Sequence, residues 1–252
     1  LAGKYGLHNH LVVSNACISG VMAMIVAGRL IAAGQFDHAV VVGADVLSRF
    51  VVSGFESLKA LSPDPCRPFD AQRKGINLGE CAAGVVLGLH ENANDASGVF
   101  ISGGGLSNDA NHISGPSRTG EELAMAMRQA LEEAGKQTEE IDFISAHGTA
   151  TLYNDEMEAK AFHIMNMAEK PINSMKGYFG HTLGAAGVLE TILSAESLKH
   201  DQLIATAGFD QIGVSKPLNI IRQPGNIKLS ACLKTASRFG GCNAAIVLQK
   251  VN

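Results

Sequence analysis

Four short stretches of the sequence carry groups that could act together on a thioester. Cys17 opens a long apolar stretch in "NACISG", His147 lies in "ISAHGTAT", Lys176 and His181 share "MKGYFGHTLGAAG", and Phe239 lies in "TASRFGGCN". A thiol at a helix N-terminus feels the positive end of the helix dipole, which favours the thiolate that attacks carbonyls. Imidazole N–H groups and glycine-rich turns can donate hydrogen bonds to an oxygen that becomes negative. Together these groups indicate acyl transfer.

Each stretch also has a purely structural interpretation. A lone cysteine in an apolar context is usually a small core residue, and a glycine-flanked histidine is more often a turn residue than a catalyst. The combination of the four stretches favours the catalytic interpretation. The other four cysteines lack such neighbours and are predicted to be structural: Cys66, Cys81, Cys232 and Cys242. Five cysteines without a CxxC pair fit a reducing, cytoplasmic compartment better than disulfides or a zinc site.

The elements expected to position these groups alternate between strands and helices, which indicates an α/β fold. Strands are predicted at residues 11–14, 38–44, 82–89, 99–103, 141–146, 171–174, 228–233 and 244–249, and helices at 18–33, 121–134, 155–165 and 183–198. Thr119 and Glu122 form a capping-box pattern, and Gly135 stands at a C-cap. The loop at 62–78 is predicted to lie on the surface. Each of the four reactive stretches follows a strand, where ligands of open α/β sheets gather.

The elements around residues 11–44 recur around residues 171–233, which indicates a duplicated α/β half. We expect residues 1–97 to be the C-terminal part of a first half that shows only its last three strands, and 98–252 to be a complete second half of five strands. The helix entrances at Cys17 and His181 would then face each other. The first residue is Leu1 rather than methionine, in keeping with an incomplete first half.

Composition excludes several classes of protein. The chain has 252 residues, 46% of them hydrophobic, and a net charge of −4, which argues against a general nucleic-acid binder. The apolar run at 18–33 is shorter than a membrane span and contains Arg29. No basic region followed by an apolar core and a cleavage site marks the start for secretion.

Six motifs resemble, in order, those of the elongating β-ketoacyl-[acyl carrier protein] synthases. They are "NACISG", "CRPFD" at 66–70, "GINLGE" at 75–80, "AHGTATLYND" at 146–155, "MKGYFGHTLGAAG" at 175–187 and "FGGCNA" at 239–244. The resemblance implies the thiolase fold, which has two βαβαβαββ halves in α-β-α-β-α layers. It also implies an acyltransferase of fatty-acid or polyketide chain elongation, without a metal or cofactor of its own, acting with an acyl carrier protein and as a homodimer.

The resemblance also implies a role for each matching residue. Cys17 would accept the acyl chain, and His147 and His181 would hydrogen-bond the malonyl thioester as it loses CO₂. Backbone N–H groups of Cys17 and Phe239 would form the oxyanion hole, where one donor is typically worth about 2.7–4 kcal/mol. Lys176 and its acidic partner Glu190 would act electrostatically, with a plain buried ion pair as the alternative.

Four further residues match supporting positions of the family. Thr149 and Thr151 would contact the pantetheine arm of the carrier protein. Asp155 and Glu158 would brace the site structurally. The histidine pair resembles the elongating enzymes, because initiating synthases carry asparagine at the second position and thiolases use a second cysteine. Chain-length-factor partners lack the cysteine, so Cys17 argues against that non-catalytic class.

The sequence departs from the family at the gating loop, where Ser237 and Arg238 precede Phe239 and Arg238 replaces a flexible glycine. Cys81 and Cys242 also occupy positions where other residues are common. These changes predict a divergent member that admits an unusual acyl chain. Basic residues in or beside the long loop, at Lys59, Arg67, Arg73 and Lys74, form a predicted docking patch for the acidic carrier protein, with an ordinary solvated loop as the alternative.

Two other functions stay open from the sequence. One is a catalytically incompetent fragment, or a partner like a chain-length factor, that docks carrier protein without turnover. The other is a cysteine hydrolase, in which water attacks the acyl-enzyme.

Overall fold

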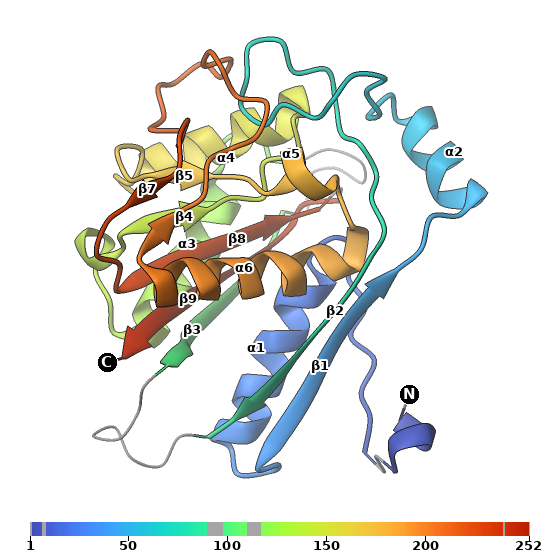
Figure 1. Cartoon of the computed structure of the whole chain (residues 1–252), viewed down its shortest axis with the longest axis vertical. Coiled ribbons are helices and arrows are strands. Elements are labelled where there is room, and N and C mark those ends of the chain that lie inside the picture. The colour runs from blue at the N-terminus through green and yellow to red at the C-terminus, as the bar shows by residue number, and fades with distance from the viewer. Residues whose placement is uncertain (1, 7–8, 90–97, 110–116, 239, 252) are drawn as a thin grey trace.

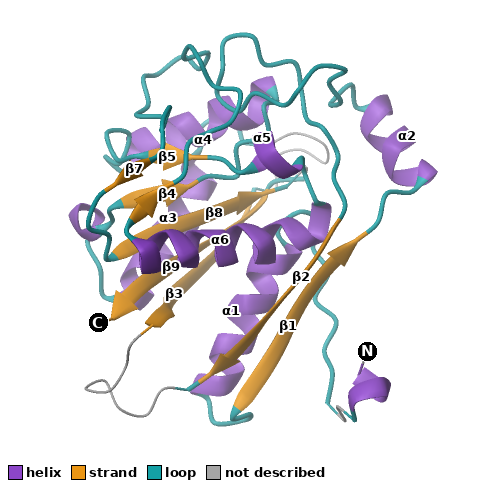
Figure 2. Cartoon of the chain, viewed as in Figure 1, coloured by secondary structure: helices purple, strands orange, loops and turns teal. Residues whose placement is uncertain are grey.

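The computed structural model describes residues 2–6, 9–89, 98–109, 117–238 and 240–251, which form alternating helices and strands (Figure 1, Figure 2). None of the described helices is both long and apolar enough to cross a bilayer. The helices are α1 (Ser19–Ala32), α2 (Arg49–Ser57), α3 (Glu121–Ala134), α4 (Leu152–Ile164), α5 (Lys176–Phe179) and α6 (Ala186–His200), with 3₁₀ turns at Ala2–Tyr5, Thr138–Glu140 and Leu183–Ala185. The strands are β1 (His38–Asp45), β2 (Cys81–Gly88), β3 (Gly98–Asn108), β4 (Phe143–Ser145), β5 (Ile172–Asn173), β6 (Gln202–Leu203), β7 (Gly225–Asn226), β8 (Ala231–Ser237) and β9 (Cys242–Val251).

Five strands form the main sheet, in the order β3-β9-β8-β4-β5. Strand β4 is parallel to both β5 and β8, whereas β9 is antiparallel to β3 and β8. All seven residues of β8 are buried because the strand lies inside the sheet and both its faces are covered. The carboxyl ends of β4, β5 and β8 therefore meet at one edge, as expected for the second half.

The elements pack in four layers (Figure 1). One hydrophobic core joins α3 and α4 to the main sheet through residues such as Met127 and Phe162. A second core joins the other face of the sheet to α1, α6 and the small β1–β2 sheet, through residues such as Val21 and Val188. The outer face of β1–β2 leaves Val40, 55% exposed, uncovered among the described residues. The fifth layer expected from the resemblance is thus absent from the described part of the chain.

The strand predicted at residues 11–14 is wrong. These residues pair with no strand among those described, and Val12 is 83% exposed. Its consecutive apolar, β-branched residues satisfy the composition of a strand, but within the described part of the chain no strand pairs with it. The first half therefore contributes the two paired strands β1 and β2 rather than three.

Helix α3 begins and ends where it was predicted, but its cap differs from the prediction. Gly120, with φ 84°, is the N-cap, and no side chain caps the helix there. The Thr119 hydroxyl instead accepts a hydrogen bond from the Glu121 N–H at 3.4 Å, so the predicted capping box does not form. The predicted C-cap at Gly135 is confirmed, with φ 61°.

The loop at 62–78 is partly buried, contrary to the prediction that it lies on the surface. Phe69, Asp70 and Arg73 are all buried. The Asp70 carboxylate accepts hydrogen bonds from the backbone N–H groups of Asp210 and Gln211. Arg73 donates to the Asp70 and Gly213 carbonyl oxygens, so it is not available to the docking patch predicted from sequence.

Candidate active site

Three reactive side chains from distant parts of the chain meet in one buried site. Ligand atoms of Cys17, His147 and His181 all lie within 4.8 Å of one another. The two imidazole rings stand edge to face, with their centroids 5.2 Å apart. Cys17 precedes α1, His147 follows β4, and His181 lies between α5 and the turn before α6. The meeting predicted from the strand ends therefore holds for these three residues.

A tight turn holds Cys17 at the entrance of α1. Ala16 adopts φ 46°, a left-handed conformation that is strained for a residue with a Cβ. The Ser19 hydroxyl bridges the turn, because it accepts from the Asn15 N–H at 2.7 Å and donates to the Ala16 carbonyl at 2.6 Å. This local network fixes the direction of the Cys17 side chain without help from a preceding strand.

The expectation that the helix N-terminus favours a Cys17 thiolate is wrong for the free site. Burial raises the pKa of the Cys17 thiol to about 11, although the nearby charges of Lys176 and Arg238 act in the opposite direction. The dipole of one helix is too weak to offset the removal of the thiolate from water. Cys17 is therefore a protonated thiol at neutral pH until a substrate changes its surroundings.

His181 offers a hydrogen-bond donor to the site. Its Nδ1 accepts from the Leu183 N–H at 3.3 Å, which places the proton of the neutral ring on Nε2. Burial lowers the pKa of His181 to about 3, with Lys176 adding to the effect, so the ring is neutral at ordinary pH. Nε2 is buried and has no hydrogen-bond partner among the described residues. A buried donor without a partner is costly, and a substrate oxygen would satisfy it.

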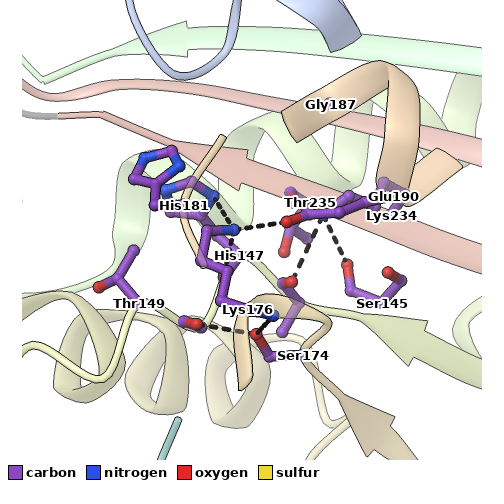
Figure 3. A network of polar contacts seen from close by, with 12 residues as sticks. Ser145, His147, Thr149, Ser174, Lys176, His181, Gly187, Glu190, Lys234 and Thr235 are labelled. Atoms are coloured by element: carbon purple, nitrogen blue, oxygen red, sulfur yellow. Dashed lines mark hydrogen bonds and ion pairs between the residues drawn. The ribbon is translucent and has the colours of Figure 1, made fainter. Parts of the chain in front are cut away.

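Lys176 fixes the tautomer of His147. The Lys176 ammonium lies 3.2 Å from Nδ1 of His147, 2.6 Å from the His147 carbonyl oxygen and 2.7 Å from Oε1 of Glu190 (Figure 3). An ammonium has three protons and accepts none, so Nδ1 must accept and Nε2 must carry the ring proton. Burial and the charge of Lys176 lower the pKa of His147 well below its usual value. Both imidazoles are thus neutral Nε2–H donors.

Glu190 lies between two lysines, one of which sequence reasoning missed. Its Oε2 is 2.7 Å from the Lys234 ammonium, and its Oε1 is 2.7 Å from that of Lys176. Burial would raise the pKa of Glu190, but the two ammonium groups together hold it below its ordinary value. A lysine within the apolar run "ACLKTAS" was the available signal, because a charge in a buried strand needs a partner.

Two buried carboxylates brace the backbone beside His147. Glu158 accepts hydrogen bonds from the N–H groups of His147 and Gly148, at 2.8 and 2.7 Å. Asp155 accepts from Thr149 N–H at 3.0 Å and from Phe69 N–H at 2.8 Å. Burial raises the pKa of Asp155 to about 7. These contacts are those of the structural brace expected from the sequence.

Thr149 and Thr151 lie beside the same turn. Their hydroxyl oxygens are 2.8 Å apart, and Thr149 is buried while Thr151 is partly exposed. Thr149 lies two residues after His147, and Thr151 is the more exposed of the pair, which suits contacts to a substrate arm that enters from outside. Their role in binding pantetheine stays a prediction.

Asn77, in the motif "GINLGE", positions His181, a role that spacing alone did not indicate. The backbone of Asn77 accepts from His181 N–H at 2.7 Å, and Gly79 N–H donates to the His181 carbonyl at 3.0 Å. The Asn77 side chain accepts from Cys66 N–H at 2.7 Å and donates to the carbonyls of Ser62 and Asp64. The long loop therefore forms one wall of the site.

Phe239, the other predicted oxyanion-hole residue, lies outside the described residues. The residues before it are held by β9: the Ser237 hydroxyl donates to the Asn243 side chain at 2.8 Å, and Arg238 N–H donates to the Cys242 carbonyl at 3.1 Å. Arg238 is close enough to Cys17 for its charge to lower the thiol pKa. The position predicted to depart from the family thus acts electrostatically on the Cys17 thiol.

The same thiol and imidazoles are spaced closely enough to share a metal ion. A cysteine and two histidines are ligands that Zn²⁺ accepts. The ammonium of Lys176 opposes this use, because it occupies the Nδ1 side of His147 and places a positive charge beside the position of a second cation. The arrangement suits an oxygen that gains negative charge better than it suits a cation.

Comparison with known proteins gives matches over most of the chain. The profile "Beta-ketoacyl synthase, N-terminal domain" matches residues 5–93, and "Beta-ketoacyl synthase, C-terminal domain" matches residues 99–210. A 3-oxoacyl-[acyl-carrier-protein] synthase 2 of Rhizobium meliloti is 35% identical over 256 residues, covering 96% of this chain and 61% of the relative. Nodulation protein E of Rhizobium meliloti is 34% identical, covering 95% of this chain and 61% of the relative. The chain thus spans about 61% of the length of these relatives.

Solved structures give the same picture. A ketosynthase of Xenorhabdus doucetiae, in complex with its chain length factor, superposes with a TM-score of 0.92 at 34% identity, covering 99% of this chain and 62% of that one. A second match is a type II polyketide ketosynthase in complex with its acyl-carrier protein, with a TM-score of 0.94 at 26% identity, covering 100% of this chain and 65% of that one. Both solved chains are thus longer than this one.

Proposed function

The chain belongs to the β-ketoacyl synthase family, with a partial thiolase-like fold, and on that premise we propose that it catalyses a decarboxylative Claisen condensation in chain elongation. The observation that carries the proposal is the pair of neutral imidazoles, His147 and His181, whose Nε2–H groups share a buried site with the Cys17 thiol. The proposed activity is that of the protein to which this chain corresponds, since its relatives are longer.

The first step transfers an acyl group from a carrier-protein thioester to Cys17. The thiol loses its proton as its sulfur attacks the carbonyl, and the carrier thiol leaves with a proton, which yields an acyl-Cys17 thioester. The approach of a polar substrate carbonyl and the positive field of Lys176 favour the thiolate at that moment. The backbone N–H of Cys17 is the proposed donor to the developing oxyanion, together with that of Phe239.

The second step generates the carbon nucleophile. A malonyl thioester places its carbonyl oxygen between the Nε2–H groups of His147 and His181, and its carboxylate leaves as CO₂. The electron pair of the broken bond moves to form an enolate, whose oxygen the two imidazoles stabilise. Its carbon attacks the acyl-Cys17 carbonyl, the Cys17 sulfur leaves and takes up a proton, and the carrier holds a chain two carbons longer.

The acyl-transfer step is tested by incubation with an acyl carrier protein substrate and mapping of the adduct by mass spectrometry. We expect the acyl mass on Cys17 and its loss in Cys17→Ala. The matched control is Cys66→Ala, because the thiol of Cys66 is also buried and also has a pKa of about 11. The acyl mass on Cys17 should be retained in that variant. Acylation that survives Cys17→Ala, or no acylation at all, would contradict the proposal. Carrier binding without acylation would favour the docking-only function, and release of free acid without malonyl-dependent extension would favour a hydrolase.

The proposed partners are an acyl carrier protein and a second copy of the chain. A related ketosynthase structure contains an acyl-carrier protein, and another contains a chain length factor. These complexes support the proposed carrier protein as a partner.

Of the basic residues first assigned to docking, Lys59 is exposed. Lys74 is exposed but paired with Asp64 at 2.7 Å, and Arg67 is partly exposed and lies 3.3 Å from Asp70. Electrostatic docking at Lys59 and Arg67 predicts an association rate that falls steeply with salt, more weakly so in Lys59→Ala. A reducing compartment, supported by five free thiols, is the proposed location.

A further inference from the structure

A second buried lysine has no role in the steps above. Lys234 lies in β8, is fully buried, and places its ammonium 2.7 Å from Oε2 of Glu190, whereas Lys176 contacts Oε1 (Figure 3). Burial lowers the pKa of Lys234, while the charge of Glu190 acts against that shift. A fully buried lysine is rare unless its ammonium is paired and hydrogen-bonded, so its surroundings identify what it does.

Four oxygen atoms surround the Lys234 ammonium. They are Oε2 of Glu190 at 2.7 Å and the carbonyl oxygens of Thr235, Ser145 and Ala146 at 2.6, 3.3 and 3.4 Å. The carbonyls come from β8 and the end of β4, so the sheet itself fixes their positions. Backbone carbonyls with one carboxylate replace the water around a monovalent cation. Three of the four distances exceed the 2.0–2.6 Å of Mg²⁺ or Ca²⁺ ligands, and the fourth lies at the upper limit of that range, which suits an ammonium-sized ion.

The cation in this cage determines how Glu190 meets Lys176. Because Lys234 contacts Oε2 of Glu190, Oε1 of Glu190 is the oxygen that faces Lys176. The distance between Oε1 and the Lys176 ammonium is 2.7 Å. Without Lys234, the buried carboxylate would have one ammonium for two oxygens. It would then take up a proton or draw the Lys176 ammonium toward itself, away from Nδ1 of His147. The tautomer of His147 depends on that contact.

We propose that Lys234 is a positioning residue whose ammonium permanently fills a monovalent-cation cage behind the reacting groups and so keeps Glu190, Lys176 and His147 aligned. The kinetic part of this inference rests on the proposed function. The cage itself does not, because its occupancy can be measured without any substrate.

The first test measures the cage directly. Lys234→Ala removes three methylenes and the ammonium, so n-propylammonium should refill the space. We compare n-propylammonium with tetramethylammonium, which is too large for the cage, at the same ionic strength. The melting temperature of Lys234→Ala should be roughly 2–4 °C higher in n-propylammonium than in tetramethylammonium. The unsubstituted protein and Lys250→Ala should show no such difference. Lys250 is a matched control, because it lies in β9 of the same sheet and pairs with Asp201 at 2.9 Å, away from Glu190.

The second test measures positioning. Malonyl decarboxylation should fall by at least ~10-fold in Lys234→Ala, equivalent to about 1.4 kcal/mol, with little change in KM, and n-propylammonium should restore part of the rate. Lys234→Met keeps most of the apolar stem of the lysine, which protects against misfolding. In this variant only the space of the ammonium is empty, so ammonium or K⁺ rather than n-propylammonium should restore the rate. A merely structural lysine would not respond to the size of the added cation.

The outcomes separate the two proposals. Full activity in Lys234→Met without added cation, or equal effects of n-propylammonium and tetramethylammonium on melting of Lys234→Ala, would overturn the inference about Lys234. A size-selective rise in melting temperature, with no condensation even by the unsubstituted protein, would support the cage and contradict the proposed function. Rescue of both melting and rate would support both.

Discussion

Gly20 of α1 and Gly187 of α6 meet where the two helices cross, and neither position has room for a Cβ. A Cβ at Gly187 would lie 2.5 Å from the Val21 nitrogen and 3.1 Å from the Gly20 carbonyl carbon, and one at Gly20 would lie 2.8 Å from the Val188 nitrogen. Gly20 lies in the first turn after Cys17, and Gly187 in the first turn after the His181 segment. Backbone contact between the helices therefore sets how far the thiol lies from the imidazole.

Gly187→Ala should separate the two helix entrances. The added methyl meets backbone rather than a movable side chain, so we expect a loss of about 1–3 kcal/mol in the free energy of unfolding and a larger proportional loss of Cys17 acylation. Gly28→Ala is the matched control in α1, because a Cβ there meets nothing within 4 Å. It should raise stability by roughly 0.5–1 kcal/mol through helix propensity. Urea unfolding and adduct mass measure the two effects, and equal stability of both variants would refute this packing argument.

Alkylation of Cys17 should follow the titration of a buried thiol. Because the pKa of Cys17 is about 11, the rate with iodoacetamide should rise ~10-fold per pH unit from pH 7 to 10 without a plateau. Lys176→Met removes a charge that lowers this pKa, so the rate should fall further at each pH. Quantified peptide masses give the rates, with the partly exposed Cys81 as internal reference. A plateau near pH 7 would mean that Cys17 is already a thiolate in the free site.

The elements of residues 98–252 were predicted more fully than those of residues 1–97. The difference lies in how far each element depends on residues distant in the sequence. Residues 121–134 matched α3 because amphipathic spacing and the terminal Gly135 act locally. Residues 11–14 were wrongly predicted as a strand, because pairing depends on neighbours that a local pattern does not reveal. The meeting of Cys17, His147 and His181 was found as predicted. A strand end positions His147, but a tight turn rather than a strand positions Cys17.

The electrostatics of the site could not be predicted in the same way. Whether Cys17 is a thiol or a thiolate depends on burial against the field of Lys176, and both depend on three-dimensional distances. Lys234 escaped notice because it stands outside every motif, and only the sheet places it beside Glu190. Arg73 was misassigned to a surface patch because proline and charged residues in a loop do not reveal which of them turn inward.

Decarboxylation should not lose rate through histidine protonation between pH 8 and pH 5. Burial and Lys176 lower the pKa of His181 to about 3 and that of His147 well below its usual value, so both rings stay neutral donors across this range. The rate of CO₂ release from malonyl carrier protein, measured with saturating substrate, tests this. Among the described residues, Asp155→Asn removes the one other buried group with a pKa of about 7 near His147. If the rate of this variant still falls at acid pH with an apparent pKa between 6 and 7, a histidine must lose a proton in that range, which would contradict this prediction.

Asp155→Asn should change how stability depends on pH. The pKa of Asp155 in the folded protein is about 7, above its ordinary value of 3.8, so the folded state binds more protons than the unfolded state between these values. The stability that Asp155 contributes is therefore full below pH ~4 and lost as the pH rises through 7, by an amount on the order of 4 kcal/mol. Asparagine cannot accept from both Phe69 and Thr149, so the variant should be less stable at low pH, but the difference should shrink toward pH 8. Denaturant unfolding at pH 4.5 and 8 measures it. Asp64→Asn is the control, because Asp64 is an exposed carboxylate paired with Lys74, and this variant should follow the unsubstituted protein. A difference that grows toward pH 8 would mean that the N–H groups and Arg73, 3.8 Å away, stabilise the carboxylate more than burial penalises it.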